Sequence, residues 1–256
     1  AGLLTSRRDG LWVFYATSRS GEEREFLRAI TPFIHPDAAM RSDLNMAAQI
    51  LEERALKTRQ FFNAIAEDWD ELNREVLGSF DLSEAVCDAV PQDCGTAVDL
   101  GCGTGGVLAR MLPKVRGLIG VDGSARMLEI CRRRFTAEDL AAGRVSLRIG
   151  ELSHLPLRDH EADFACINLV LHHLSDPSEG LREIRRIMAV GGRLFVADFQ
   201  RHADETMRIR YGDRWLGFDE QQLGLDLAAA GFAVLHCKHM QVNRNMTMLL
   251  LSAEAR

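Results

Sequence analysis

The densest group of residues with chemical potential is VDLGCGTGG, residues 98–106. Gly101, Gly103 and Gly106 fit G-x-G-x-x-G, the spacing in which backbone approaches a pyrophosphate where a helix begins. Counted from Asp99, the same letters fit D-x-G-x-G-x-G. The segment therefore predicts a bound nucleoside, and its neighbours must decide which one.

The carboxylate of Asp99 favours a cationic ligand over a pyrophosphate. At close range in a low local dielectric it would repel phosphate charge. The α-ammonium and the sulfonium of S-adenosylmethionine would instead be attracted. Asp122 comes at the end of the next predicted strand, where an acid accepts hydrogen bonds from ribose hydroxyls. That role is common to NAD and S-adenosylmethionine, so Asp122 supports a nucleoside without choosing between them.

Read from Asp99, the glycine segment resembles motif I of the S-adenosylmethionine-dependent methyltransferases. GELSHLPL, residues 150–157, resembles the methyltransferase segment in which an acid reaches the adenine amino group and the next backbone N–H reaches a ring nitrogen. Residues 163–177 (DFACINLVLHHLSDP) and 181–199 (LREIRRIMAVGGRLFVADF) are similar to the UbiE-like methyltransferase pattern. They depart from it at residues 189–192, where that family usually has a proline before the glycines.

The resemblance implies a cofactor site for S-adenosylmethionine, with S-adenosylhomocysteine as product or effector, and a small-molecule methyl acceptor. The implied cofactor-binding residues are Asp99, Gly101, Cys102, Gly103, Thr104, Asp122, Gly123, Met127, Glu151, Leu152 and Asn168. Methyl transfer is an in-line displacement in which positioning does much of the catalysis. A general base is needed only where the acceptor loses a proton. His172 and His173 are the candidates for the acceptor side, and the alternative is that each is satisfied by loop backbone.

The segment beyond Phe80 alternates strand and helix patterns, which predicts a mostly parallel sheet with helices on both faces. The predicted fold is therefore α/β: a Rossmann-like class I methyltransferase sheet with an antiparallel C-terminal hairpin, preceded by a β-hairpin wing and a helical linker. The expected strands are residues 97–100, 118–121, 145–149, 164–170 and 193–198. The expected helices are residues 107–112, 125–135, 177–189 and 219–230.

The first residues, AGLLTSRRDGLWVFYAT, predict a β-hairpin in which residues 3–6 and 11–16 flank a turn at Arg8-Asp9-Gly10. This stretch resembles the wing of an ArsR-type winged-helix repressor. The resemblance implies that Arg7 and Arg8 lie at a DNA-contacting wing tip, and that the helix-turn-helix precedes this chain. The alternative is a solvated turn. Two arginines supply few phosphate contacts, so this chain alone should bind DNA poorly.

A helical region is expected next. Ser20 and Glu23 are spaced as a capping box, and Pro36 interrupts the region. Apolar residues from Met40 to Leu72 then recur at spacings of three and four, which predicts a helix with a continuous seam broken only at Thr58. Its second half, residues 59–72, resembles the linker helix of ArsR-methyltransferase fusions. The resemblance implies a homodimer through these helices, with packing on the following domain as the alternative.

The predicted domains are a remnant wing at residues 1–19, a helical linker and dimerisation region at 20–78, and the methyltransferase domain at 79–256. The formal net charge of −6 argues against a surface built wholly for nucleic acid. The chain shows no apolar run long enough to span a bilayer and no signal peptide, so we expect a cytoplasmic protein with no membrane association.

The six cysteines are scattered without C-x-x-C pairs, which favours reduced thiols. His236, Cys237 and His239 are expected on alternating faces of one strand, so no metal site is predicted.

Two functions follow from the sequence. The first is an S-adenosylmethionine-dependent methyltransferase acting on an unidentified small molecule, in a protein whose full-length form also binds DNA. The second is a transcriptional regulator that uses the same domain to sense S-adenosylmethionine or S-adenosylhomocysteine.

Overall fold

The computed structural model describes residues 2–9, 12–17, 21–35 and 37–256. The chain forms two compact units, the first extending to Glu52 and the second beginning at Glu53. The first unit contains β1 (Leu4–Asp9), β2 (Trp12–Thr17), α1 (Gly21–Ile30), the 3-10 helix η1 (Thr31–Phe33) and the start of α2 (Ala38–Ile65). The second contains the rest of α2 and the entire central sheet.

The predicted N-terminal hairpin is present, with β1 and β2 antiparallel. Strand β1 is longer than expected because its pairing continues to Asp9, opposite Trp12. Arg7 and Arg8 therefore belong to β1 and not to the turn. The expected turn residue Gly10 and the capping residue Ser20 lie outside the described residues, as does Pro36.

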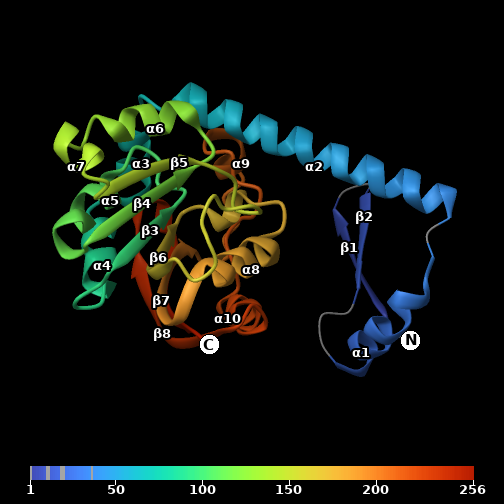
Figure 1. Ribbon diagram of the computed structural model, residues 1–256. Coiled ribbons are helices and arrows are strands. Elements are labelled where there is room, and N and C mark those ends of the chain that lie inside the picture. Colours follow the sequence, from blue (N-terminus) through green and yellow to red (C-terminus); the bar gives the residue numbers. More distant parts are fainter. Residues whose placement is uncertain (1, 10–11, 18–20, 36) are drawn as a thin grey trace. The chain divides into compact units, whose positions relative to one another are not determined.

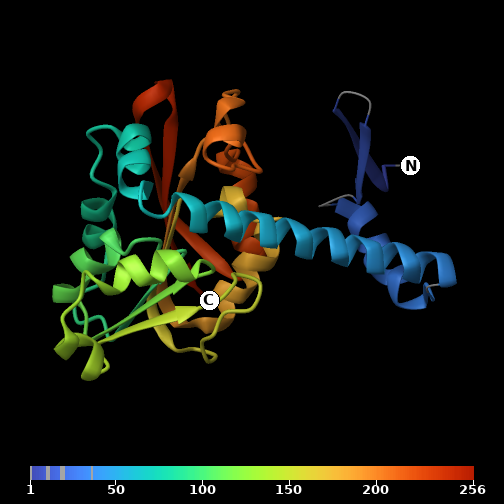
Figure 2. The same cartoon turned by 90° about the horizontal axis from the view of Figure 1, so that it is seen from above.

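The long amphipathic region is two helices and not one. Helix α2 ends at Ile65, residues 66–68 form a turn, and α3 runs over Trp69–Leu77. Helix α3 packs within the second unit, where Val76 and Leu77 are buried. The continuous seam predicted through Leu72 was wrong for this reason. Figure 2 shows α2 along its length.

The second unit is built on a seven-stranded sheet in the order β5-β4-β3-β6-β7-β9-β8 (Figure 1). The first five are parallel, and β9 pairs antiparallel with both β7 and β8. The predicted fold class is confirmed. The strands are β3 (Thr96–Leu100), β4 (Gly117–Asp122), β5 (Val145–Ile149), β6 (Ala162–Asn168), β7 (Met188–Phe199), β8 (Phe232–Gln241) and β9 (Thr247–Ala255).

Helices cover both faces of this sheet because its strands are apolar on both sides. On β3, Ala97 belongs to a core formed with α4, α5 and α6, whereas Val98 and Leu100 belong to a core formed with α8 and α10. Aspartate or serine side chains cap the N-termini of α4, α6, α8 and α10. The helices are α4 (Leu82–Ala89), α5 (Gly106–Met111), α6 (Ala125–Arg132), α7 (Ala137–Ala141), α8 (Pro177–Ile187), α9 (Thr206–Arg210) and α10 (Glu220–Ala229), with 3-10 turns η2 (Leu112–Lys114), η3 (Leu171–His173) and η4 (Asn243–Asn245).

Most predicted boundaries differ from the observed ones by one to three residues. The largest difference is β7, which begins at Met188 and not near Arg193. The Gly191-Gly192 pair lies inside this strand beside an irregularity in its register with β6. In the part of the chain that the structure describes, no helix has both the length and the apolar character needed to cross a membrane.

Candidate functional site

The glycine turn lies between β3 and α5, beyond the carboxyl end of β3. Gly101, Gly103 and Gly105 all have positive φ, of 72°, 52° and 82°, a conformation that glycine adopts without steric cost. A Cβ at Gly101 would lie 2.4 Å from a methyl of Val170, and one at Gly105 would lie 2.4 Å from Sγ of Cys131. The turn therefore requires glycine at alternate positions.

Gly106 separates the two patterns that the sequence allowed. In the dinucleotide fingerprint the third glycine permits close packing of helix on strand. A Cβ at Gly106 would meet no atom within 4 Å. The structurally required glycines are thus those of D-x-G-x-G-x-G, counted from Asp99.

The backbone donors of the turn are already used within the protein. The N–H groups of Gly101 and Cys102 donate to the carbonyl oxygen of Val121 at 2.8 and 3.0 Å. The N–H of Gly103 donates to Asp122 Oδ2 at 2.8 Å, and that of Gly105 to the Cys102 carbonyl at 2.9 Å. A turn whose donors are satisfied in this way is poorly suited to cradle a pyrophosphate.

Asp99 is buried at 2% exposure, at the junction of β3 and β6. Its Oδ1 accepts hydrogen bonds from Cys166 Sγ at 3.3 Å and Asn168 Nδ2 at 3.5 Å. Burial is the main cause that raises the pKa of Asp99 to about 7, with a contribution from the Asp122 charge. The other polar atom of the amide, Asn168 Oδ1, is buried without a hydrogen-bond partner. A ligand ammonium would supply both the donors and the positive charge that this place lacks.

Asp122 ends β4, the strand beside β3. Its Oδ1 accepts the N–H of Ser124 at 2.7 Å, while its Oδ2 accepts that of Gly103. Burial raises the pKa of Asp122, and these two hydrogen bonds oppose the rise. Each carboxylate oxygen keeps a second lone pair. Both can still accept hydroxyl donors such as those of a ribose.

Residues of α2 and α3 contact this edge of the sheet, which the sequence did not reveal. Ser124 Oγ donates to Asn63 Oδ1 at 2.6 Å, and Thr104 Oγ1 donates to Asp70 Oδ1 at 2.5 Å. The indole of Trp69 lies against Gly103, where an added Cβ would be 3.2 Å from Nε1. The helical linker therefore forms one wall of the candidate site.

The remaining implied cofactor residues surround the ends of β4 and β5. Glu151 forms an ion pair with Arg59 Nη1 of α2 at 3.1 Å. Met127 is buried, and its N–H donates to the Ser124 hydroxyl that caps α6. Gly123 lies beside the Arg59 stem, and Leu152 is partly buried and packs with the core under α8. The structure thus brings these residues to the carboxyl-terminal end of the parallel strands, where Asp99 and Asp122 also lie.

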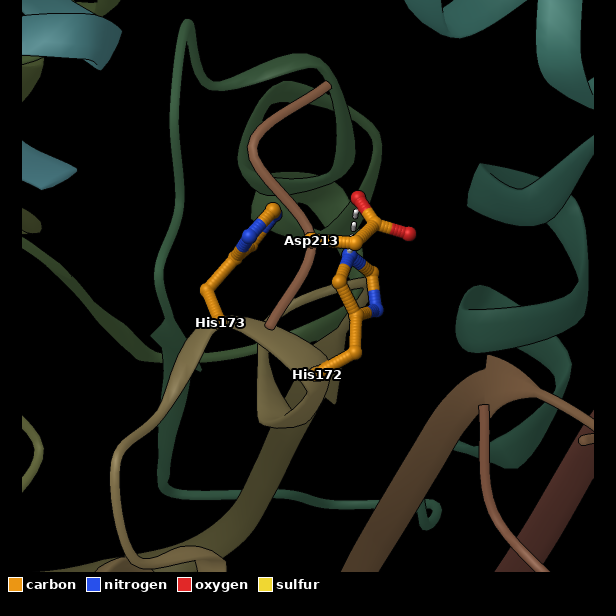
Figure 3. Close-up of side chains that lie close together, drawn as sticks. All are labelled: His172, His173 and Asp213. Carbon is orange, nitrogen blue, oxygen red and sulfur yellow. Dashed lines mark ion pairs between the residues drawn. The ribbon is translucent and has the colours of Figure 1, made fainter. Parts of the chain in front are cut away.

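The two histidines lie in η3, just beyond β6. His172 Nδ1–H donates to Asp198 Oδ1 at 2.7 Å, and His172 Nε2 lies 3.6 Å from Asp213 Oδ1. His173 Nδ1–H donates to the Gly212 carbonyl at 3.2 Å, and its ring lies edge-on to Phe62 at 4.9 Å between centroids. Figure 3 shows the two imidazoles and the Asp213 carboxylate side by side.

The environment separates the pKa values of these two rings. Burial lowers the pKa of His172, but the charge and hydrogen bond of Asp198, together with the Asp213 charge, outweigh it and raise that pKa. Burial and then the neighbouring His172 charge lower the pKa of His173 well below its usual value. The pKa of His172 therefore lies above the usual histidine value, and that of His173 lies below it.

A second group of side chains lies on the sheet edge at β8. Cys237, His239 and Glu220 bring ligand atoms within 4.8 Å of one another, and His239 Nε2 is 3.0 Å from Glu220 Oε2. Residues 237 and 239 are two apart and share a face of the strand, which the expectation of alternating faces did not take into account. His236 is not part of this group.

Comparison with known proteins shows what this part of the chain is similar to. Residues 98–196 match the methyltransferase domain family. The UbiE ubiquinone/menaquinone biosynthesis C-methyltransferase of Geotalea daltonii is 29% identical over 155 residues, covering 58% of this chain and 66% of that protein. The chain spans 30% to 66% of the length of the curated relatives that it matches.

Solved structures share the fold of the methyltransferase domain. A Haloferax volcanii methyltransferase, in complex with the Trm112 methyltransferase activator, aligns with a TM-score of 0.64 at 19% identity, covering 76% of this chain and 97% of that one. Phosphoethanolamine N-methyltransferase 2 of Haemonchus contortus, in complex with S-adenosyl-L-methionine, aligns with a TM-score of 0.58 at 14% identity, covering 70% and 53%. These structures confirm the predicted Rossmann-like methyltransferase fold, and residues 98–196 are similar to the methyltransferase domain family.

Proposed function

We propose that this protein transfers a methyl group from S-adenosylmethionine to a small-molecule acceptor. One observation carries the proposal: a buried Asp99 and a partly exposed Asp122 lie near the carboxyl ends of the neighbouring parallel strands β3 and β4, beside a turn after β3 that requires glycine at 101, 103 and 105. This end of the sheet offers the Asp99 carboxylate to an ammonium group and the Asp122 carboxylate to ribose hydroxyls. It offers few free backbone donors to a phosphate.

The ligand's amino-acid part is assigned to Asp99 and Asn168, because the unpartnered Asn168 Oδ1 and the Asp99 carboxylate both accept hydrogen bonds. Its ribose is assigned to Asp122. Gly123, Met127, Glu151 and Leu152 are assigned to the adenosine part, with Glu151 accepting from the adenine amino group. Gly101, Cys102, Gly103 and Thr104 shape the turn beneath the methionine chain.

For the acceptor side, His172 is the better candidate base. Asp198 holds its Nδ1–H and stabilises the imidazolium that forms when Nε2 takes a proton. His173, with a lowered pKa, acts as a neutral lining group. S-adenosylmethionine supplies an activated methyl group, so His172 is needed only where the acceptor must lose a proton.

The decisive assay is calorimetric titration with S-adenosylmethionine and S-adenosylhomocysteine, followed by an acceptor screen that measures S-adenosylhomocysteine formation. Asp122→Ala should weaken binding of both sulfur ligands, and Asp88→Ala on an exposed part of α4 is the matched control. NADH serves as the competing ligand. Binding of NADH without binding of either sulfur ligand would overturn the proposal.

A second candidate function is regulation, favoured by the hairpin β1–β2 that precedes the helical region. We propose that the hairpin is an ArsR-type wing with Arg7 and Arg8 near DNA, and that the natural full-length protein binds DNA as a homodimer in the cytoplasm. Exposed apolar residues on α2, among them Leu44 and Leu51, support dimerisation. The free state of all six cysteines supports a reducing compartment.

In this second function, S-adenosylmethionine or S-adenosylhomocysteine would change DNA affinity by binding one state of the dimer more tightly. The test is a gel-shift titration of the natural full-length protein on DNA from upstream of its own gene. Ligand-dependent affinity supports sensing. Equal affinity with and without both ligands refutes it, whether or not the domain transfers methyl groups.

A further inference from the structure

We propose that His172, His173 and Asp213 form a binding site for a divalent transition-metal cation such as Zn²⁺, and that in the metal-bound state His172 Nε2 is a ligand and no longer the candidate base. The three side chains are all buried, at 3%, 7% and 4% exposure. They come from two segments, η3 and the segment after α9, that the fold brings together. One ligand atom from each lies within 4.8 Å of the others.

The spacing of these atoms suits a small cation. With metal–ligand distances of about 2.0–2.1 Å, two ligands on a tetrahedral cation are about 3.3–3.4 Å apart. His172 Nε2 and Asp213 Oδ1 are 3.6 Å apart. A shift of about 0.2–0.3 Å at the carboxylate would bring this pair to the tetrahedral spacing.

Both imidazoles are oriented as metal ligands usually are. The outer nitrogen of a metal-bound histidine almost always donates to a carboxylate or a backbone carbonyl. Here His172 Nδ1–H donates to the Asp198 carboxylate, and His173 Nδ1–H donates to the Gly212 carbonyl. Since a carboxylate and a carbonyl accept these protons, the Nε2 atom of each ring is left to carry the free lone pair.

Asp213 supplies an independent observation. Both of its carboxylate oxygens are buried without a hydrogen-bond partner. A buried carboxylate without donors is costly, so such groups are normally paired or bind metals. A cation at this position would satisfy Asp213 and would compensate the charge of two nearby acids, Asp198 and Asp213. Three protein ligands also leave a coordination position for water or for an acceptor oxygen.

The alternative is that a doubly protonated His172 bridges the carboxylates of Asp198 and Asp213 without metal. These states differ in measurable ways.

The chain is stripped with a chelator, dialysed against Zn²⁺ or Co²⁺ until the bound fraction is constant, and analysed for metal by mass spectrometry. One metal per chain is expected, and ¹⁵N NMR should place it on Nε2 of His172 and His173.

Three variants test the ligand set. Asp213→Asn should lower Zn²⁺ affinity more than a hundredfold, and Asp198→Asn about tenfold to a hundredfold, the usual effect of losing an outer partner. His239→Gln, in the cluster on β8, should leave affinity unchanged. Retained S-adenosylhomocysteine binding shows that each variant is folded.

The Co²⁺ absorption spectrum of the unaltered chain shows whether the metal has a thiolate ligand, and it does not depend on any variant being folded. A site of two imidazoles and a carboxylate gives no near-ultraviolet thiolate charge-transfer band. Such a band would place the metal at Cys237 and overturn the proposal. Absence of stoichiometric metal, together with a doubly protonated His172 in NMR, would overturn it equally.

Discussion

Replacing Gly105 by alanine puts a methyl group 2.4 Å from Sγ of Cys131, at a backbone φ of 82°. The left-handed conformation costs a non-glycine residue about 1–2 kcal/mol. The close contact with a buried side chain adds about 1–3 kcal/mol, the usual range for overpacking. The expected loss of unfolding free energy is therefore about 2–5 kcal/mol.

Gly106→Ala is the matched control one residue later. The added Cβ meets no atom within 4 Å, and Gly106 is the first residue of α5. Alanine is the better helix former by about 1 kcal/mol, so this variant should be neutral or slightly stabilised. Urea denaturation of both variants measures the difference. Equal destabilisation of the two, or a neutral Gly105→Ala, would refute the assignment of the required glycines to the Asp99-based pattern.

Further predictions concern charge and hydrogen bonding at the site. Asp99→Asn should weaken S-adenosylhomocysteine binding about tenfold to a hundredfold in calorimetry, as loss of a charged hydrogen bond predicts, and unchanged affinity would contradict the assignment of Asp99. Because burial raises the pKa of Asp99 to about 7, its carboxyl gains a proton as pH falls through 7. Ligand affinity should therefore fall below neutrality in the unaltered chain but not in Asp99→Asn. The raised pKa also means that the folded chain loses stability as pH rises from 3.8 to about 7. At pH 8, Asp99→Asn should therefore be at least as stable to unfolding as the unaltered chain. A large destabilisation of the variant at that pH would contradict the raised pKa of Asp99. Asp198→Asn should lower the pKa of His172 in an NMR titration, since it removes the nearest charge that raises it, and an unchanged midpoint would disprove the interaction between His172 and Asp198. Asn63→Ala should cost about 1 kcal/mol of stability through one lost hydrogen bond, and a denaturation midpoint equal to that of the unaltered chain would exclude this contact.

The sequence predicted the sheet because its signals are local. Buried parallel strands appear as short apolar runs, and capping residues such as Ser124, Asp176 and Asp219 mark where helices begin. The glycine turn was also visible, but its letters allowed two patterns. Only the positive φ values and the space around each glycine distinguish Gly105 from Gly106.

Contacts between distant segments left no signal in the sequence. Asp70 and Thr104, or Asp213 and His172, meet only because of how helices and loops pack on the sheet. The same limitation explains the predicted seam through Leu72. Apolar spacing of three and four continues across the turn at residues 66–68, so periodicity alone cannot show that the helix ends there.

A crystal structure of this chain with S-adenosylhomocysteine would show whether Asp99 and Asp122 hold the ligand. We expect the ligand ammonium within hydrogen-bond distance of Asp99 and Asn168, and the ribose hydroxyls within hydrogen-bond distance of Asp122. A ligand bound elsewhere, with Asp99 still paired only to Cys166 and Asn168, would contradict this expectation.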